Sequence, residues 1–87
     1  MSDSVTVLYF AGLREQVGRE SETVTLAPDV QTVKDFLAVL RQQDAAFNTV
    51  FSQFPRMRVA VNKVMGDLST AVQNGDEIAF FPPMTGG

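Results

Sequence analysis

The chain has 87 residues, a net charge of −3, and neither cysteine nor histidine. Its length predicts one small domain, and an apolar content of 45% suffices for one core. The missing side chains exclude Cys/His zinc sites, cysteine nucleophiles and Ser–His triads. The acidic balance argues against nucleic-acid binding. Without a long apolar run or a basic leader, we expect no membrane segment and a cytoplasmic location.

The first third of the chain predicts two strands. Residues 5–10 are β-branched and aromatic with apolar groups on both faces, which is typical of a strand inside a sheet. Gly12 and Gly18 bracket a polar stretch that we interpret as a loop with room for a helical turn. Residues 22–26 alternate in polarity and predict a second strand, close enough to the first to form a hairpin.

The middle third predicts one main helix and one shorter helix. Thr32 is expected to cap the main helix, although Asp35 stands where a capping box prefers Glu or Gln. Both helices show apolar residues at positions i, i+3, i+4 and i+7. These are Val33, Phe36, Leu37 and Leu40 in the first helix, and Phe47, Val50, Phe51 and Phe54 in the second. Pro55 should end the second helix.

The last third predicts strands over residues 57–62 and 77–81, separated by a weakly patterned stretch and a turn at 73–76. The order ββαββ favours an α+β domain in which a mixed sheet packs on one main helix. If the first and last strands are neighbours in the centre of this sheet, the arrangement is a β-grasp, or ubiquitin-like, fold.

Residues 82–87 predict an extended, flexible C-terminal tail after the last strand. Pro82 and Pro83 restrict the backbone, whereas Gly86 and Gly87 carry no side chains. Five residues beyond Pro82 span about 17 Å when extended. Such a tail fits a narrow channel and presents the ionised carboxylate of Gly87 at its tip. The alternative is a frayed chain end without a role.

Three stretches together resemble one family: Leu8–Glu15, Val59–Asn62 and Asn74–Gly87, which ends Phe-Phe-Pro-Pro-Met-Thr-Gly-Gly. The family is the small, sulfur-carrying subunit of molybdopterin synthase (MoaD). The resemblance implies a β-grasp fold over residues 1–87. It also implies a partner, the large subunit of the synthase, in a heterotetramer with two copies of each subunit.

The resemblance implies chemistry at Gly87. In the family, an ATP-dependent activating enzyme (an adenylyltransferase) adenylylates the terminal carboxylate, and sulfur from a donor protein converts it to a thiocarboxylate. The sulfur then passes to cyclic pyranopterin monophosphate. A thiocarboxylate is ionised at neutral pH and needs no neighbouring base to act as a nucleophile. This is consistent with a chain that lacks His and Cys. We expect no bound cofactor, and a sulfur-donating subunit rather than an enzyme by itself.

Partner contacts are expected around the end of the last strand. Alternation along a strand places Phe80 and Phe81 on opposite faces. We expect Phe80 in the core and Phe81 facing the partner, with Phe10 and Arg14 beside Phe81 by resemblance. A solvated surface charge is the alternative for Arg14. The tail residues expected to enter the partner are Pro82, Pro83, Met84, Thr85 and Gly86.

Three other functions stay open. One is a sulfur carrier for thiamine synthesis or tRNA thiolation, and another is a ubiquitin-like modifier that joins lysines through Gly87. The third is a β-grasp interaction module with a passive tail. Deleting Gly86 and Gly87 separates the last from the others, because only a passive tail would be dispensable.

Overall fold

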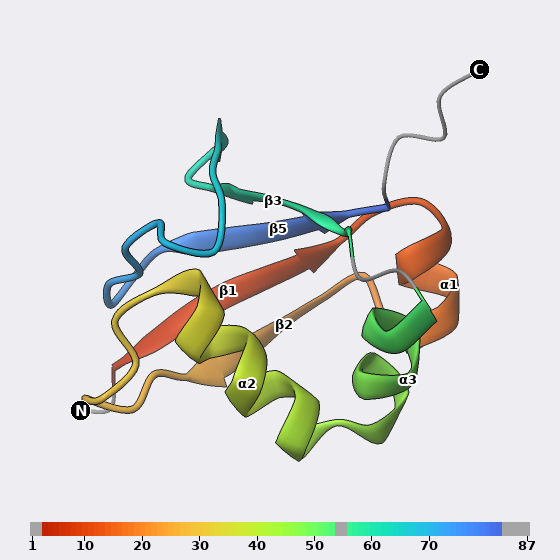
Figure 1. Cartoon of the computed structure of the whole chain (residues 1–87), viewed down its shortest axis with the longest axis horizontal. Coiled ribbons are helices and arrows are strands. Elements are labelled where there is room, and N and C mark those ends of the chain that lie inside the picture. The colour runs from red at the N-terminus through yellow and green to blue at the C-terminus, as the bar shows by residue number, and fades with distance from the viewer. Residues whose placement is uncertain (1–2, 54–55, 83–87) are drawn as a thin grey trace.

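The computed structural model describes residues 3–53 and 56–82, and Figure 1 shows the arrangement of its elements. In chain order these are β1 Ser4–Tyr9, α1 Gly12–Val17, β2 Ser21–Thr25, α2 Val33–Gln43, α3 Ala45–Gln53, β3 Arg58–Val61, β4 Val64–Met65 and β5 Glu77–Phe81. The four predicted strands and both predicted helices are present, with bounds that differ by one or a few residues. Strand β4 is an addition, and Phe54 and Pro55 lie outside the described residues.

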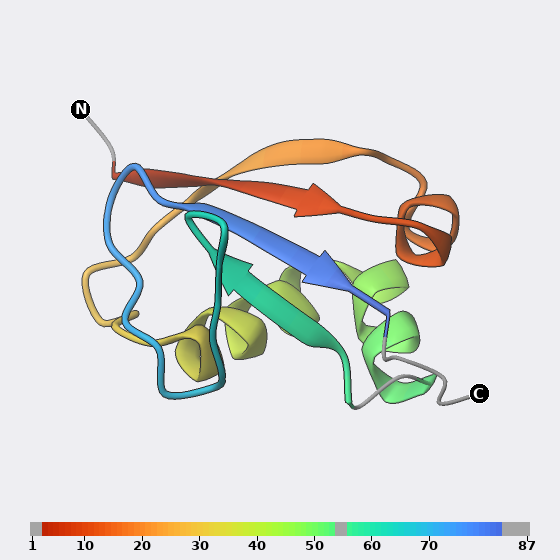
Figure 2. The same ribbon diagram turned by 90° about the horizontal axis from the view of Figure 1, so that it is seen from above.

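The five strands form one sheet in the order β2-β1-β5-β3-β4. Strands β1 and β5 run parallel, whereas the other three neighbouring pairs are antiparallel. The sheet is therefore mixed, and the first and last strands are neighbours in its interior (Figure 2). This pairing is the condition that defines the β-grasp fold, so the predicted fold class is confirmed.

Helices α2 and α3 cover one face of the sheet, and we refer to the opposite face as the helix-free face (Figures 1 and 2). Alternate residues of the inner strands point toward the helices and are at most 8% exposed: Val5, Val7, Tyr9, Val59, Val61, Ile78 and Phe80. They meet the buried sides of α2 and α3, which supply Val33, Phe36, Leu37, Leu40, Phe47 and Val50. The predicted helical periodicity thus marks the core as expected.

The N-terminus of α2 carries a complete capping box. The Thr32 hydroxyl accepts a hydrogen bond from the Asp35 amide at 3.3 Å. The Asp35 carboxylate accepts from the amides of Gln31 at 3.0 Å and Thr32 at 3.2 Å. These bonds, above all the one from Gln31, lower the pKa of Asp35 below its usual value. A carboxylate one methylene shorter than Glu therefore closes the box fully.

Two short elements extend what the pattern of the sequence predicted. The stretch between Gly12 and Gly18 is a helix rather than a loop, because Leu13 and Val17 bury one side of it. Strand β4 follows β3 through a two-residue turn in which Asn62 and Lys63 both have positive φ, 52° and 69°. Such turns suit the twist of a hairpin. In the described part of the chain, no helix is long and apolar enough to span a bilayer.

Candidate functional site

Strand β5 divides its two aromatic side chains between the faces of the sheet. Phe80 is 1% exposed and belongs to the core, as predicted. Phe81 is half-buried and lies on the helix-free face, because its register partner on β3 is Arg58 rather than the buried Val59. The predicted division of Phe80 and Phe81 therefore matches the structure.

Phe81 forms a stacked pair with Phe10 across two strands. The parallel register pairs Tyr9 with Phe80, and the Phe10 amide donates a hydrogen bond to the Phe80 carbonyl at 3.2 Å. The next side chains are then adjacent, with ring centroids 4.8 Å apart and planes 7° from parallel. Phe10 is 41% exposed. We call these two residues the stacked pair, an apolar surface of the kind that commonly marks an interface.

The chain turns sharply as it leaves the stacked pair. Ala11 has φ 54° and ψ −132°, a conformation that costs a residue with a Cβ about 1–3 kcal/mol. Helix α1 begins at the next residue, so Phe10 is held between β1 and α1. The Arg14 side chain is exposed on α1, at the end of the sheet where β5 also ends (Figure 1). Within residues 3–53 and 56–82, Arg14 makes no ion pair.

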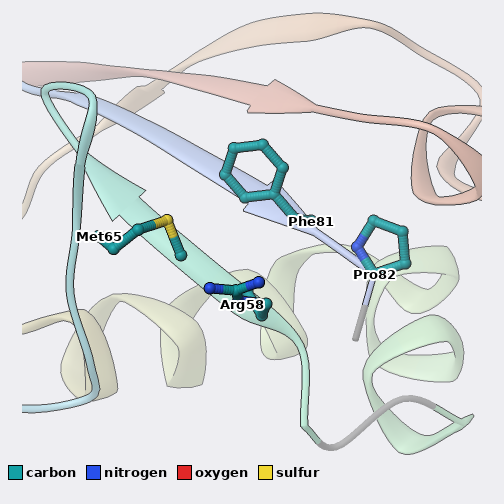
Figure 3. Close-up of a pocket in the computed structure, with 4 residues that line it drawn as sticks. All are labelled: Arg58, Met65, Phe81 and Pro82. Carbon is teal, nitrogen blue, oxygen red and sulfur yellow. The ribbon is translucent and has the colours of Figure 1, made fainter. Parts of the chain in front are cut away.

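A hollow of about 320 Å³ adjoins the stacked pair on the helix-free face. Arg58, Met65, Phe81 and Pro82 line it, and Figure 3 shows these side chains on the same side of β3 and β5. Met65 is 49% exposed and comes from β4. Sequence reasoning missed Arg58 and Met65, because strand alternation gives the face of Arg58 only after the pairing of β3 with β5 is known. No pattern marked the two-residue strand of Met65.

A cluster of buried aromatic rings packs against this end of the sheet on the face that the helices cover. The centroid of Phe80 lies 5.5 Å from that of Phe47 on α3 and 6.3 Å from that of Tyr9 on β1. Tyr9 and Phe47 are 6.2 Å apart. Aromatic pairs at these spacings add to the energy of burial. The end of β5, from which the tail leaves, therefore packs on a group of three mutually close aromatic rings in the core.

A polar network joins the same cluster to the surface. The Tyr9 hydroxyl donates to the Glu22 carboxylate at 2.6 Å, and Arg19 pairs with both Glu22 and Asp44. Burial, followed by the bond to Glu22, raises the pKa of Tyr9 well above its usual range. Partial burial raises the pKa of Asp44, but hydrogen bonds from the Phe47 amide and Arg19 outweigh it and leave a lowered pKa. These groups are satisfied and structural.

The remaining predicted site residues lie outside the described part of the chain: Pro83, Met84, Thr85, Gly86 and Gly87. Of the predicted partner contacts, the structure thus brings together Phe10, Phe81 and Pro82, and places Arg14 at the same end of the sheet. Among the described residues, no group of three or more carboxylate, Cys or His side chains could hold a metal ion.

Comparison with known proteins identifies relatives that match nearly the whole chain. A molybdopterin synthase sulfur carrier subunit from Haemophilus influenzae is 37% identical over 83 residues, which cover 95% of this chain and 99% of the relative. Small archaeal modifier protein 1 from Haloferax volcanii has a similar crystal structure, with a TM-score of 0.75, 28% identity, and coverage of 94% of this chain and 99% of that chain.

A complex of subunits 1 and 2 of molybdopterin-converting factor from Helicobacter pylori contains a chain with the same fold. Its TM-score is 0.63 at 24% identity, covering 97% of this chain and 99% of that one. The resemblance to molybdopterin synthase small subunits is confirmed by the relative from Haemophilus influenzae. The model of the ThiS family matches residues 7–87. The chain therefore belongs to the ThiS family.

Proposed function

We propose that this chain is the sulfur carrier subunit of a molybdopterin synthase, and that Gly87 carries the sulfur. The observation that supports this most directly is the partly exposed stacked pair of Phe10 and Phe81, because Phe81 immediately precedes Pro82 and the tail. An apolar docking surface followed directly by the C-terminal tail suits a protein that delivers its terminus into a partner. The relative from Haemophilus influenzae described above is named as a molybdopterin synthase sulfur carrier subunit, which also supports the proposal.

The chemistry proposed for Gly87 proceeds in two stages. The terminal carboxylate attacks the α-phosphate of ATP on an activating enzyme, which releases pyrophosphate and leaves an acyl adenylate. Sulfide supplied by a donor protein then attacks the acyl carbon, the bond to AMP breaks, and the product is a terminal thiocarboxylate. Adenylylation turns an oxygen that cannot leave into AMP, which can, and AMP is then lost when sulfur is added. Both stages would take place on partner enzymes, so the chain itself would need no catalytic side chain. Its sequence, which has no Cys or His, is consistent with that division of labour.

The large subunit of the synthase would receive the charged tail. Contacts with the stacked pair would fix the root of the tail, and the restricted backbone of Pro82 and Pro83 would lower the ordering cost of insertion. Glycines at the tip would let the thiocarboxylate pass a channel too narrow for a Cβ. The sulfur would then be transferred to cyclic pyranopterin monophosphate, and the carboxylate would return for another cycle.

The test is reconstitution with purified activating enzyme, sulfur donor and large subunit. Replacement of the terminal oxygen by sulfur adds about 16 Da, which intact mass measurement should detect and fragmentation of the C-terminal peptide should assign to Gly87. We expect Gly87→Ala to fold normally but to lose most sulfur transfer, whereas Gln42→Ala, exposed on α2, should transfer at the wild-type rate. Transfer by Gly87→Ala at the wild-type rate would contradict the proposal.

A ubiquitin-like modifier is the second candidate, favoured by the similarity to small archaeal modifier protein 1. It predicts isopeptide bonds between Gly87 and lysines of other proteins, which tryptic mass spectrometry of cell extracts would detect. A carrier for another thiolation pathway would accept sulfur but bind a different acceptor protein. Binding assays with candidate large subunits separate that case from the proposal.

A further inference from the structure

Arg58 is a cation placed at an apolar docking surface. It lies opposite Phe81 in the β3–β5 register and lines the same hollow as Met65, Phe81 and Pro82. Its side chain is exposed, and Figure 3 shows it between Met65 and Pro82. A partner that covers Phe81 and fills this hollow will therefore also cover the guanidinium group.

No carboxylate in the described part of the chain pairs with Arg58. The ion pairs found there both involve Arg19. Asp67 lines an adjoining hollow with Arg58, but its carboxylate accepts hydrogen bonds from the Ser69 hydroxyl at 2.7 Å and amide at 2.9 Å. Glu77 lies on the same face as Phe81 but four residues earlier on β5, about 13 Å along the strand.

The cost of burying the Arg58 guanidinium indicates which side chain the partner must place beside it. An unpaired guanidinium is costly to cover with apolar surface, whereas a carboxylate within reach forms a charge-assisted and often bidentate pair. The geometry is favourable, because Arg58 lines the hollow together with the apolar side chains of Met65 and Phe81. An apolar side chain can fill the hollow while an adjacent carboxylate reaches Arg58.

We propose that Arg58 selects the partner: the large subunit of the synthase docks an apolar side chain against Phe81 and Met65 and pairs an Asp or Glu with Arg58. This inference rests on the proposed function, since it assigns the chemistry of that same interface. The carboxylate would act chiefly on specificity, because like-charged or neutral partners would leave the cation unpaired.

The test measures binding of the full-length chain to the purified large subunit at several salt concentrations. Arg58→Glu reverses the charge, and Arg58→Met removes the charge but keeps an unbranched side chain. Lys34→Glu, at an exposed position of α2, is the matched control, because it changes the net charge from −3 to −5 just as Arg58→Glu does. Thermal melting of each variant establishes that it is folded.

We expect Arg58→Glu to raise Kd at least tenfold more than Lys34→Glu. Arg58→Met should lose most of the salt dependence of the wild-type Kd. A charge reversal at the partner's carboxylate should restore binding of Arg58→Glu. Equal Kd values for Arg58→Glu and Lys34→Glu, with wild-type salt dependence in Arg58→Met, would overturn the inference while leaving the proposed function intact.

Two further outcomes also decide the matter. A wild-type chain that does not bind the large subunit would overturn the proposed function and this inference with it. Sedimentation of the free chain tests a second copy of the chain as the alternative occupant. A dimer that Arg58→Glu dissociates would overturn the assignment of this face to the large subunit, whereas a monomer agrees with it.

Discussion

The adjacent Phe80 and Phe81 on β5 should differ in what their truncation affects most. Phe80→Ala should chiefly lower stability, and Phe81→Ala should chiefly weaken partner binding. Phe80 is 1% exposed within the aromatic cluster, so Phe80→Ala removes a buried ring and should cost about 3–5 kcal/mol of unfolding free energy. Phe81 is half-buried and stacked on Phe10. Comparing Phe80→Ala with Phe81→Ala therefore tests which of the two rings contributes to the core and which to the docking surface.

The magnitude for Phe81→Ala follows from its two contributions to stability. Full burial of a Phe side chain stabilises by about 1.5–3 kcal/mol, and roughly half of that applies to a half-buried ring. Stacking on Phe10 adds about 0.5–1.5 kcal/mol. Part of both is recovered by relaxation of the exposed Phe10, so we expect a loss of about 1–2 kcal/mol. For a domain of this size each kcal/mol shifts Tm by about 4–8 °C.

Binding should show the reverse order of effects. In a complex that covers the stacked pair, Phe81 loses its remaining contact with water and gains contacts with the partner. Aromatic anchors at the centre of an interface cost about 2 kcal/mol or more when truncated, which is about 30-fold in Kd. We expect Phe81→Ala to weaken binding of the large subunit by at least that factor.

Urea unfolding and calorimetric titration measure the two effects on the same samples. The double-mutant cycle with Phe10→Ala tests the stack, since rings in contact should show a coupling energy in unfolding. The reasoning would be refuted if Phe81→Ala cost as much stability as Phe80→Ala while binding the partner with wild-type affinity. That result would assign Phe81 to the core.

Two further predictions concern the scaffold: one tests backbone strain at Ala11, and the other tests the pH dependence that Asp44 contributes. Ala11→Gly should raise the unfolding free energy by about 1 kcal/mol, because glycine relieves the strain at φ 54°, whereas Ala38→Gly inside α2 should lower it by about 1 kcal/mol; urea unfolding in which Ala11→Gly is also destabilising would argue against strain. The lowered pKa of Asp44 means that its ionised form stabilises the fold above pH 4, and that this contribution is lost as the pH falls through the lowered folded-state pKa. Asp44→Asn, which keeps a capping oxygen for the Phe47 amide, should flatten the fall in stability below about pH 4; a curve as steep as that of the wild type would place the effect elsewhere.

Local patterns predicted much of the fold because they report burial directly. The spacing of Val33, Phe36, Leu37 and Leu40 identified the buried side of α2, and all four are at most 7% exposed. Alternation at the end of β5 separated Phe80 from Phe81. Helix α1 and strand β4 were harder to predict, since six and two residues are too few to establish a period.

The candidate site was predictable only where it lies on one continuous segment. Phe81 and Pro82 follow each other, so the alternation of a strand and the stiffness of proline were enough to single them out. Phe10 and Arg14 were expected there only through the resemblance to a family. Arg58 and Met65 were missed, since they reach the hollow through strand pairings that no local pattern encodes.

By itself, the sequence determined a chemical limit of this protein: without Cys, no side-chain thiol can carry sulfur. It also determined the longer strands and the two main helices, because periodicity reflects the side of each element that is buried. Only the tertiary structure decided that β1 lies parallel to β5, which brings Phe10 against Phe81, and that β3 places Arg58 beside them. Strand order and register arise from contacts between distant segments, and a shift of one residue would move every side chain to the other face.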